Sequence, residues 1–470
     1  MKHILLSASL LLSLFSGSAQ NQVQPGTPDG TGDWIGALSG PGLTLFFHIT
    51  GNAQSGYKAD WSSLQEHAFG LPCKSVIIRD DSVMLETSGI KAVYRGKYLP
   101  VADSIPGVWE QGGKTWPLGL KRMRRPQTPK PPFPYKSDSV EYDNTAGTVH
   151  LGATFTRPMT GDKFAVAILI TGSGQQDRDE TIFQHRPFAI IADYLTRQGI
   201  AVLRVDDRGT GKSKGELRTA SSADFADDVL AGIRYLKTRK DVDSLRIGLI
   251  GHSEGGLIAP IVYSRWPHLK FIVLLAGPGV PGSEISLKQQ TDPILTLSRP
   301  AYEAYYRLVK EKMTILNDHY GQPDSLTMRL LKASFTQWKA TLTDSMVAFL
   351  HVQKVSPEIY GMQEMMELIP WFRYFYKTDP AFFLQQVKCP VLALNGAKDT
   401  QVDPDQNIPA IKAALRSAGA PVETHIFPDL NHLFQHCRTG DAGEYAIIEE
   451  TMSPEVLQVM ADWTRKICTL

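Results

Sequence analysis

The pattern of apolar and polar positions divides the chain into regions of different character. Between residues 32 and 121 the apolar runs are short, and Gly, Asn and Asp separate them, as in strands joined by turns. The runs are 43–47, 75–78, 82–85 and 92–94, and Asp80-Asp81 forms a hairpin-like turn between two of them. This pattern predicts a small all-β module over residues 30–122.

From residue 139 the pattern changes, because strand-like runs now alternate with helical ones. The runs are 139–142, 149–155, 165–170, 201–205, 247–250, 271–275, 391–394 and 424–427. Several are continuously apolar, which is typical of strands buried on both faces. Between them, Phe225, Val229, Ile233 and Leu236 recur at helical spacing. The alternation predicts an α/β domain over residues 137–470, with an eight-stranded, mostly parallel sheet covered by helices.

Two further segments interrupt these regions. Residues 123–136 hold five prolines and predict a stiff, extended linker between the module and the α/β domain.

Residues 284–383 have helical character without a strand-like rhythm, and they separate two predicted sheet strands. An insertion of this length is usually functional rather than a plain connection. We therefore expect a helical cap on the α/β domain.

The N-terminus has the pattern of a secretory signal peptide. Lys2 and His3 precede an apolar run over residues 4–15, and Gly17-Ser18-Ala19 supplies small side chains at a cleavage site. The run of about twelve residues is short for a bilayer-spanning helix of about twenty, although an N-terminal membrane anchor is the alternative. We expect residues 1–19 to be removed and the mature protein to be periplasmic or secreted.

Composition narrows the classes of function. With 42% hydrophobic residues and a formal net charge of +1, the chain is neither disordered nor a typical nucleic-acid binder, which needs a basic surplus. The four cysteines, Cys73, Cys389, Cys437 and Cys468, have no metal-binding spacing. An exported protein permits a Cys437–Cys468 disulfide, and buried free thiols are the alternative.

The strongest chemical motif is a G-x-S-x-G sequence directly after a predicted strand. Gly251-His252-Ser253-Glu254-Gly255 follows the apolar run 247–250 and leads into a helix. This arrangement places a serine hydroxyl on a sharp strand-to-helix turn, and only small residues fit two positions to either side. The motif predicts that Ser253 is a catalytic nucleophile.

A nucleophilic serine needs a base, and the base needs an acid that orients it. In this architecture the acid follows a late strand, and Asp399 lies in the exit loop after the run 391–394. Asp403 and Asp405 are alternatives, but they flank Pro404 and are better placed to cap a helix that begins near Gln406. We expect Asp399 to be the acid.

The base should be a histidine after the last strand, and His432 follows the run 424–427. His425 lies within that strand and cannot reach the sheet edge. His436 is the alternative, one helical turn beyond His432. We expect His432 to accept the proton of Ser253 and Asp399 to fix the tautomer of its ring.

The negative charge of a tetrahedral intermediate needs two backbone N–H donors. One should come from Glu254, the residue after the nucleophile, and the other from the glycine-rich loop after the run 165–170. Ser173 is the expected second donor, and Gly174 is the alternative.

One motif is misleading. Gly211-Lys212-Ser213 resembles the end of a phosphate-binding loop, but the first glycine of that pattern would fall at position 206, which is Asp206. A nucleotide site is therefore excluded, and Arg208 is expected to hold its loop beneath the active site.

Five motifs, in order and spacing, resemble the α/β-hydrolase superfamily. They are Thr171-Gly172-Ser173-Gly174 followed by Asp177-Arg178-Asp179-Glu180, Asp207-Arg208-Gly209 with Gly211 and Ser213, Gly251-His252-Ser253-Glu254-Gly255-Gly256, Leu394-Asn395-Gly396 with Asp399, and Leu430-Asn431-His432. The resemblance runs from about residue 139 to the C-terminus. It is greatest to secreted bacterial serine carboxylesterases related to serine-aminopeptidase-like hydrolases, and the helical insertion lies where such enzymes have a cap. Many relatives have His where this chain has Thr171.

The residues and the resemblance together predict an exported serine hydrolase of carboxylic esters. Its partner would be a small acyl ester, no cofactor or metal is implied, and the aromatic segment 371–376 would roof an apolar acyl pocket.

Two other functions stay open. A serine peptidase or aminopeptidase would use the same triad and would need carboxylates for a free amino group, for which Glu180, Glu254, Glu364 and Glu367 are candidates. A catalytically silent glycan-binding protein is the third hypothesis, and the β-module has no assignable ligand.

Overall fold

The computed structural model describes residues 30–63, 68–144, 147–295 and 298–469. These residues fall into two compact units, one containing residues 30–126 and 442–449 and the other residues 127–441 and 450–469. The predicted signal peptide, residues 1–19, lies outside the described residues. None of the helices in the described ranges combines the length and apolar character needed to cross a bilayer.

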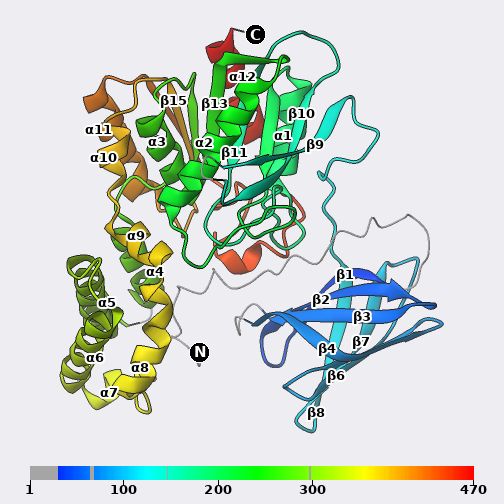
Figure 1. Ribbon diagram of the computed structural model, residues 1–470. Coiled ribbons are helices and arrows are strands. Elements are labelled where there is room, and N and C mark those ends of the chain that lie inside the picture. The colour runs from blue at the N-terminus through cyan, green and yellow to red at the C-terminus, as the bar shows by residue number, and fades with distance from the viewer. Residues whose placement is uncertain (1–29, 64–67, 145–146, 296–297, 470) are drawn as a thin grey trace. The chain divides into compact units, whose positions relative to one another are not determined.

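The first unit is a closed eight-stranded barrel, drawn in blue and cyan in Figure 1. Its antiparallel strands are β1 (Gly32–Leu38), β2 (Leu43–Asn52), β3 (Gly56–Ser63), β4 (Ala68–Arg79), β5 (Ser82–Thr87), β6 (Ala92–Lys97), β7 (Ser104–Gln111) and β8 (Lys114–Arg122). The barrel closes where β1 pairs with β8. This agrees with the predicted all-β module, and Asp80-Asp81 forms the turn from β4 to β5.

Alternation along the strands sends bulky side chains into the barrel. Trp34, Phe47, Tyr94 and Trp109 are each almost fully buried there. The Phe47 and Tyr94 rings stack with centroids 5.9 Å apart. The interior is therefore a packed aromatic core.

The second unit is built on an eight-stranded sheet with the order β16-β15-β14-β13-β11-β12-β10-β9. The strands are β9 (Tyr135–Asp143), β10 (His150–Pro158), β11 (Phe164–Ile170), β12 (Ala201–Val205), β13 (Val242–His252), β14 (Ile272–Leu275), β15 (Val391–Gly396) and β16 (Val422–Phe427). Pairs among β11 to β16 are parallel, whereas β10 pairs antiparallel with β9 and β12. Each of the eight predicted runs overlaps one of these strands. Residues 123–134, between β8 and β9, form neither helix nor strand.

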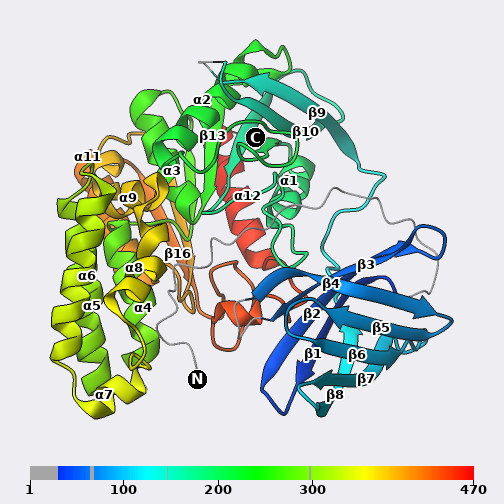
Figure 2. The same cartoon turned by 60° about the horizontal axis from the view of Figure 1, so that its bottom comes forward.

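Helices cover both faces of this sheet (Figures 1 and 2). On one face, α1 (Pro187–Arg197) and α12 (Pro454–Cys468) share a core with Leu169, Ile250 and Phe271. On the other, α2 (Ser222–Thr238), α3 (Glu254–Arg265) and α11 (Pro404–Ala418) pack on Ile168 and Leu249. The sheet is thus buried on both faces, which explains its continuous apolar runs.

The helical insertion lies between β14 and β15. It consists of α4 (Gly282–Leu295), α5 (Arg299–Asp318), α6 (Asp324–Ala340), α7 (Asp344–Phe349), α8 (Pro357–Gln363), η2 (Glu364–Leu368), α9 (Pro370–Lys377) and α10 (Pro380–Leu384). Helices α5 to α8 lie together, away from the sheet, in both views. They enclose an apolar core of their own around Leu308, Phe335 and Trp338.

No disulfide joins the four cysteines, all of which lie in the described part of the chain. Cys389 and Cys468 are buried, and Cys73 and Cys437 are half-buried. Burial raises the pKa of the Cys389 thiol to about 12. The Cys437–Cys468 disulfide is thus absent from the structure.

Candidate active site

Ser253 lies on the sharp turn between β13 and α3. Its backbone has φ 51° and ψ −120°, in a region that non-glycine residues avoid at a cost of about 1–3 kcal/mol. The flanking glycines permit this turn. A Cβ on Gly251 would lie 2.1 Å from the Gly255 carbonyl oxygen, and one on Gly255 would lie 2.2 Å from the Ile170 carbonyl oxygen. The spacing of the motif is therefore a requirement of backbone packing.

Asp399 and His432 meet at the ends of β15 and β16. The Nδ1 atom of His432 lies 2.8 Å from Oδ2 of Asp399, and both side chains are almost fully buried. The other carboxylate oxygen accepts the backbone N–H groups of Gln401 and Val402 at 2.8 and 2.9 Å. Asp399 is thereby fixed in position and orients the His432 ring through Nδ1.

The loop of His432 also lies against the turn of Ser253. The rings of His252 and His432 have centroids 4.8 Å apart. Among the described residues, the structure records no hydrogen bond between the Ser253 hydroxyl and His432. Catalytic hydrogen bonds are often long before substrate binds.

The alternative residues have other partners. Asp403 caps α11, because its side chain accepts the N–H groups of Asp405 and Gln406 at 2.8 and 3.2 Å. The helix begins at Pro404, two residues before the expected start. His425 is paired with Glu423, and His436 with Glu450; both histidines have exposed side chains.

The loop after β11 approaches Ser253 closely. A Cβ on Gly172 would lie 3.2 Å from Ser253 Cβ. The Gly172 N–H donates to Glu180 Oε1 at 2.6 Å, which leaves the following amides, Ser173 and Gly174, as candidates for an oxyanion donor. Glu254 is the first residue of α3, where a helix has no internal acceptor for the N–H.

Asp207 holds this loop from the other side. Its carboxylate accepts the Thr171 hydroxyl at 2.7 Å and the Gln176 N–H at 2.9 Å. Burial raises the pKa of Asp207 well above its usual value, although the two hydrogen bonds oppose the shift. Thr171 therefore anchors the loop through its hydroxyl group.

Ser173, Ser253 and Glu254 line one pocket, which holds about 650 Å³ of space including space open to solvent. The other lining residues are Pro278, Ile285, Ser286, Gln289, Trp371, Phe372, Phe375, Tyr376, Gln401 and Val402. The rings of Trp371 and Phe375 stack with centroids 5.2 Å apart. The segment 371–376 thus contributes an aromatic wall, but the polar side chains make the pocket less apolar than the sequence suggested.

Within this pocket, the Glu254 carboxylate is buried beneath the cap. One of its oxygens accepts the Ser222 hydroxyl at 2.6 Å and the Trp371 indole N–H at 2.8 Å. Burial raises the pKa of Glu254 to about 7, and the two hydrogen bonds oppose that shift. Sequence reasoning placed Trp371 at the pocket but did not predict either hydrogen bond, since Ser222 and Trp371 lie 32 and 117 positions from Glu254 and no local motif links them.

The other candidate carboxylates for an amino group have partners elsewhere. Glu180 accepts from Gly172, and its Oε1 also lies 2.9 Å from His252 Nδ1. Glu364 and Glu367 lie 2.9 and 3.3 Å from Lys312 Nζ, inside the cap. Of the four, Glu254 alone is a lining residue of the pocket that contains Ser253.

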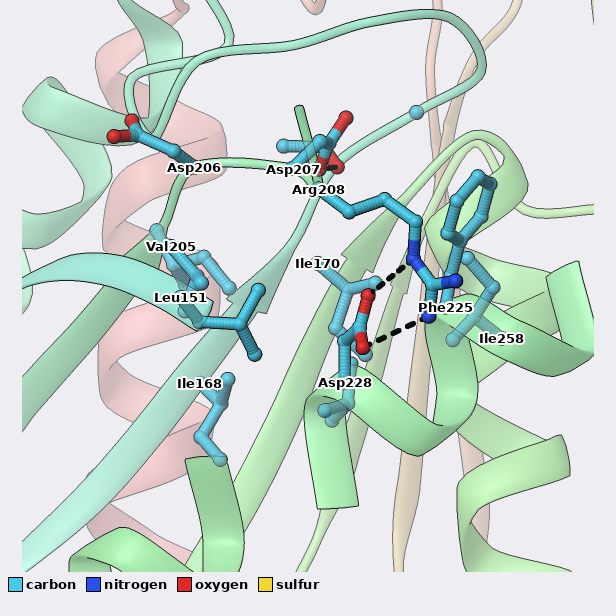
Figure 3. Close-up of a pocket in the computed structure, with 14 residues that line it drawn as sticks. Leu151, Ile168, Ile170, Val205, Asp206, Asp207, Arg208, Phe225, Asp228 and Ile258 are labelled. Atoms are coloured by element: carbon cyan, nitrogen blue, oxygen red, sulfur yellow. Dashed lines mark hydrogen bonds and ion pairs between the residues drawn. The ribbon is translucent and has the colours of Figure 1, made fainter. Parts of the chain in front are cut away.

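A second pocket, shown in Figure 3, lies beside the first two residues of the same loop, Thr171 and Gly172, and does not include Ser253. Apolar side chains such as Leu151, Ile168 and Ile258 line it. The Arg208 guanidinium binds both oxygens of Asp228, at 2.8 and 2.9 Å. Arg208 therefore ties the loop after β12 to α2, and no catalytic candidate takes part in that ion pair.

Comparison with known proteins gives the following matches. The family described as serine aminopeptidase, S33, matches residues 185–342, and the prolyl oligopeptidase family matches residues 322–450. Esterase EstD of Thermotoga maritima is 25% identical, with 69% of this chain and 67% of EstD covered. The uncharacterized protein YfhR of Escherichia coli O157:H7 is 33% identical, with 32% of this chain and 54% of YfhR covered. The solved esterase Pf2001 of Pyrococcus furiosus is 17% identical, with 73% of this chain and 98% of Pf2001 covered and a TM-score of 0.43.

Proposed function

We propose that the chain, which belongs to the α/β-hydrolase superfamily, is an exported serine hydrolase that cleaves carboxylic esters. The observation that carries the proposal is the geometry around Ser253. A strained serine, two candidate oxyanion donors and a pocket coincide, and a buried Asp–His pair lies on the adjoining loop. The similarity to an esterase supports the choice of ester as substrate.

In the proposed mechanism, Ser253 attacks the acyl carbonyl carbon while His432 accepts the hydroxyl proton. Asp399 stabilises the imidazolium that forms. The N–H groups of Ser173 and Glu254 donate to the oxyanion of the tetrahedral intermediate. His432 then protonates the leaving alcohol, which departs and leaves the acyl-enzyme. Water next attacks the acyl carbonyl carbon while His432 accepts its proton, and His432 returns that proton to Ser253 as the acid leaves.

Export is part of the proposal, to the periplasm or to the medium. The apolar run 4–15 and the small residues at 17–19 support it. Mass spectrometry of the mature protein is expected to find Gln20 at its N-terminus; an intact Met1 on exported protein would contradict cleavage after Ala19.

Substitution of the nucleophile tests the proposal. Wild-type protein, Ser253→Ala and the control Ser264→Ala should be assayed on p-nitrophenyl acetate and p-nitrophenyl octanoate. Loss of a catalytic serine costs about a million-fold in kcat. Ser264 lies on the same helix, and its hydroxyl donates to the Ile261 carbonyl, so its loss should leave turnover near wild type. Ester turnover that persists in Ser253→Ala would refute the proposed nucleophile.

A peptidase is the second candidate, because both matching families are peptidases by description and because the Glu254 carboxylate lies in the pocket. A free amino group of a substrate would be attracted to this carboxylate when it is ionised. Aminoacyl p-nitroanilides separate the two functions. Turnover of the anilides without turnover of either ester would replace the esterase proposal by the peptidase.

A further inference from the structure

A buried pair, Glu180 and His252, connects the loops of the candidate active site. Glu180 Oε1 accepts the Gly172 N–H at 2.6 Å and lies 2.9 Å from His252 Nδ1. The other ring nitrogen of His252 lies 3.1 Å from the His432 carbonyl oxygen. The pair therefore contacts the loop of Gly172, the turn of Ser253 and the loop of His432.

The partners of His252 indicate its protonation. A carboxylate oxygen and a carbonyl oxygen are both acceptors, so the ring makes both hydrogen bonds only when both nitrogens carry protons. A neutral ring with a protonated Glu180 would place a proton on the oxygen that already accepts from Gly172. The observed contacts thus favour an imidazolium paired with a carboxylate. With both nitrogens occupied, His252 is not available as the base for Ser253.

The pair also lies where the backbone is strained. Glu180 has φ 53° and Ser253 has φ 51°, both in the left-handed region. Such conformations persist when surrounding contacts determine them, and they cluster at functional sites. The side chains of Glu180 and His252 are only 6% and 7% exposed, so water does not compete for their hydrogen bonds.

We propose that Glu180 and the imidazolium of His252 are positioning residues that hold the oxyanion loop, the Ser253 turn and the His432 loop in one catalytic arrangement. The proposal rests on the proposed function of this site. Loss of the charge on His252 leaves its ring one N–H for two acceptors, Glu180 Oε1 and the His432 carbonyl oxygen, so one of the two hydrogen bonds is lost and the His432 loop is held less firmly relative to Ser253. The chemical step should slow, while binding in the pocket, which neither side chain lines, should change little.

The charges around His252 determine how this arrangement depends on pH. Burial lowers the pKa of His252, but Glu180, the His432 carbonyl oxygen and Asp399 outweigh it, so the pKa is raised overall. The His432 ring also faces it, with the two ring centroids 4.8 Å apart, and is itself titratable. A raised pKa means that the charged pair is present at low pH and is lost as pH rises through the raised value. Without the Glu180 charge, that loss should occur at lower pH.

Three variants test the proposal. Glu180→Gln keeps the shape but removes the charge, and Glu180→Asp keeps the charge on a shorter side chain. Asp193→Asn is the control, because it neutralises another partly buried carboxylate, which pairs with Arg197 on α1 away from the site. Each variant should be compared with wild type in kcat and KM for p-nitrophenyl acetate from pH 5 to 10. The rate at which a fluorophosphonate labels Ser253 and the thermal unfolding midpoint should also be measured.

We expect Glu180→Gln to lower kcat and the labelling rate about ten- to a hundred-fold, as for a lost hydrogen bond to a charged group, with KM nearly unchanged. The alkaline limb of its kcat profile should move to lower pH, and Glu180→Asp should restore part of kcat. Asp193→Asn should keep the wild-type profile even if its unfolding midpoint falls.

Two results would overturn the proposal. In the first, Glu180→Gln keeps the wild-type kcat and the wild-type pH profile. In the second, its kcat falls only in proportion to the loss of folded protein, and the alkaline limb of its kcat profile does not move. Failure of the proposed function looks different. In that case the wild-type protein itself neither hydrolyses the ester nor is labelled at Ser253, and the proposed positioning role is refuted together with the proposed function.

Discussion

Glu254 shows how neighbouring groups change the chemistry of a single side chain. It follows Ser253 directly, so the turn fixes its position, and its carboxyl group lies buried beneath the cap. Burial raises its pKa to about 7, while hydrogen bonds from Ser222 and Trp371 oppose the shift. No cation is among the causes of the shift. Near neutral pH this carboxyl group therefore changes between its acid and its anion.

The raised pKa predicts a pH-dependent stability. A carboxyl group with a pKa near 7 when folded and 4.5 when unfolded stabilises the folded state fully below pH 4.5. One unit of pKa difference corresponds to about 1.36 kcal/mol, so the difference between 4.5 and about 7 contributes about 3 kcal/mol. This contribution is lost as pH rises through 7. Glu254→Gln stays neutral, so its free energy of unfolding relative to wild type should rise by about that amount between pH 4.5 and 8.

Urea unfolding of wild type and Glu254→Gln at several pH values measures this difference. Glu423→Gln is the control, since the side chain of Glu423 is 51% exposed and paired only at the surface. A Glu254→Gln difference that does not vary with pH would show that the pKa of Glu254 is not raised in the folded protein.

Glu180 marks the limit of what sequence reasoning could say about single residues. Its carboxylate was a candidate to bind a substrate amino group, but the structure places it beneath Gly172 and beside His252. His252 carried no expectation of its own within the motif. The contact depends on loops separated by 72 positions, so no local pattern could reveal it.

At the scale of elements, the turn from β13 to α3 explains why its glycines cannot be exchanged. Gly255 packs against the end of β11, where the nearest atom to an added Cβ is a backbone carbonyl oxygen. Gly256 packs in the same way on Gly277, whose Cα would lie 2.6 Å from an added Cβ. The start of α3 thus approaches the end of β11 and the residue Gly277 after β14 closely through backbone atoms.

Gly255→Ala should therefore destabilise the protein strongly. A methyl group 2.2 Å from the Ile170 carbonyl oxygen cannot be relieved by a side-chain rotation. We expect a loss of about 3 kcal/mol or more in the free energy of unfolding, at the upper end of overpacking effects. Gly119→Ala in β8 is the control, because an added Cβ there meets no atom within 4 Å. Equal stability of the two variants would contradict the packing of this turn.

The sequence predicted the helices and strands well where a run of apolar residues, or their helical spacing, extended over several residues. Each strand of the sheet overlaps an expected run, and Phe225, Val229, Ile233 and Leu236 all lie on α2. The start of α11 was misplaced by two residues, because Asp403 rather than Asp405 caps it. Cap geometry depends on one backbone angle and one side-chain contact, which a hydrophobic pattern does not record.

At the scale of the whole molecule, the cap has an apolar core of its own, which Phe225 and Phe375 join to one core of the sheet. The cap core surrounds Leu308, Phe335 and Trp338, whereas the sheet has one core on each face. Lys312 joins the cap helices, since its Nζ lies 2.9 Å from Gln290 Oε1 on α4 and contacts the two glutamates of η2. The cap is therefore a unit that could open by itself.

Lys312→Met tests this independence. It leaves Glu364 and Glu367 buried without their cation, which should cost about 3–5 kcal/mol. Hydrogen exchange should show faster exchange across α5 to α9, while β11 and β13 keep their protection. Lys310→Met, at an exposed position on the same helix, is the control. Uniformly faster exchange in both cap and sheet would mean that the two unfold together.

The sequence by itself determined what depends on local spacing. Neighbours along the chain set the turn around Ser253, the alternation of strands and helices, and the helical insertion. They also place Ser253, Asp399 and His432 after the strands β13, β15 and β16 of the sheet. The tertiary structure alone decided which distant groups meet: Glu254 with Ser222 and Trp371, Thr171 with Asp207, and Glu180 with Gly172 and His252. The physical reason is that a buried polar group takes whichever partner the fold brings within about 3 Å, and that distance in space is independent of separation along the chain.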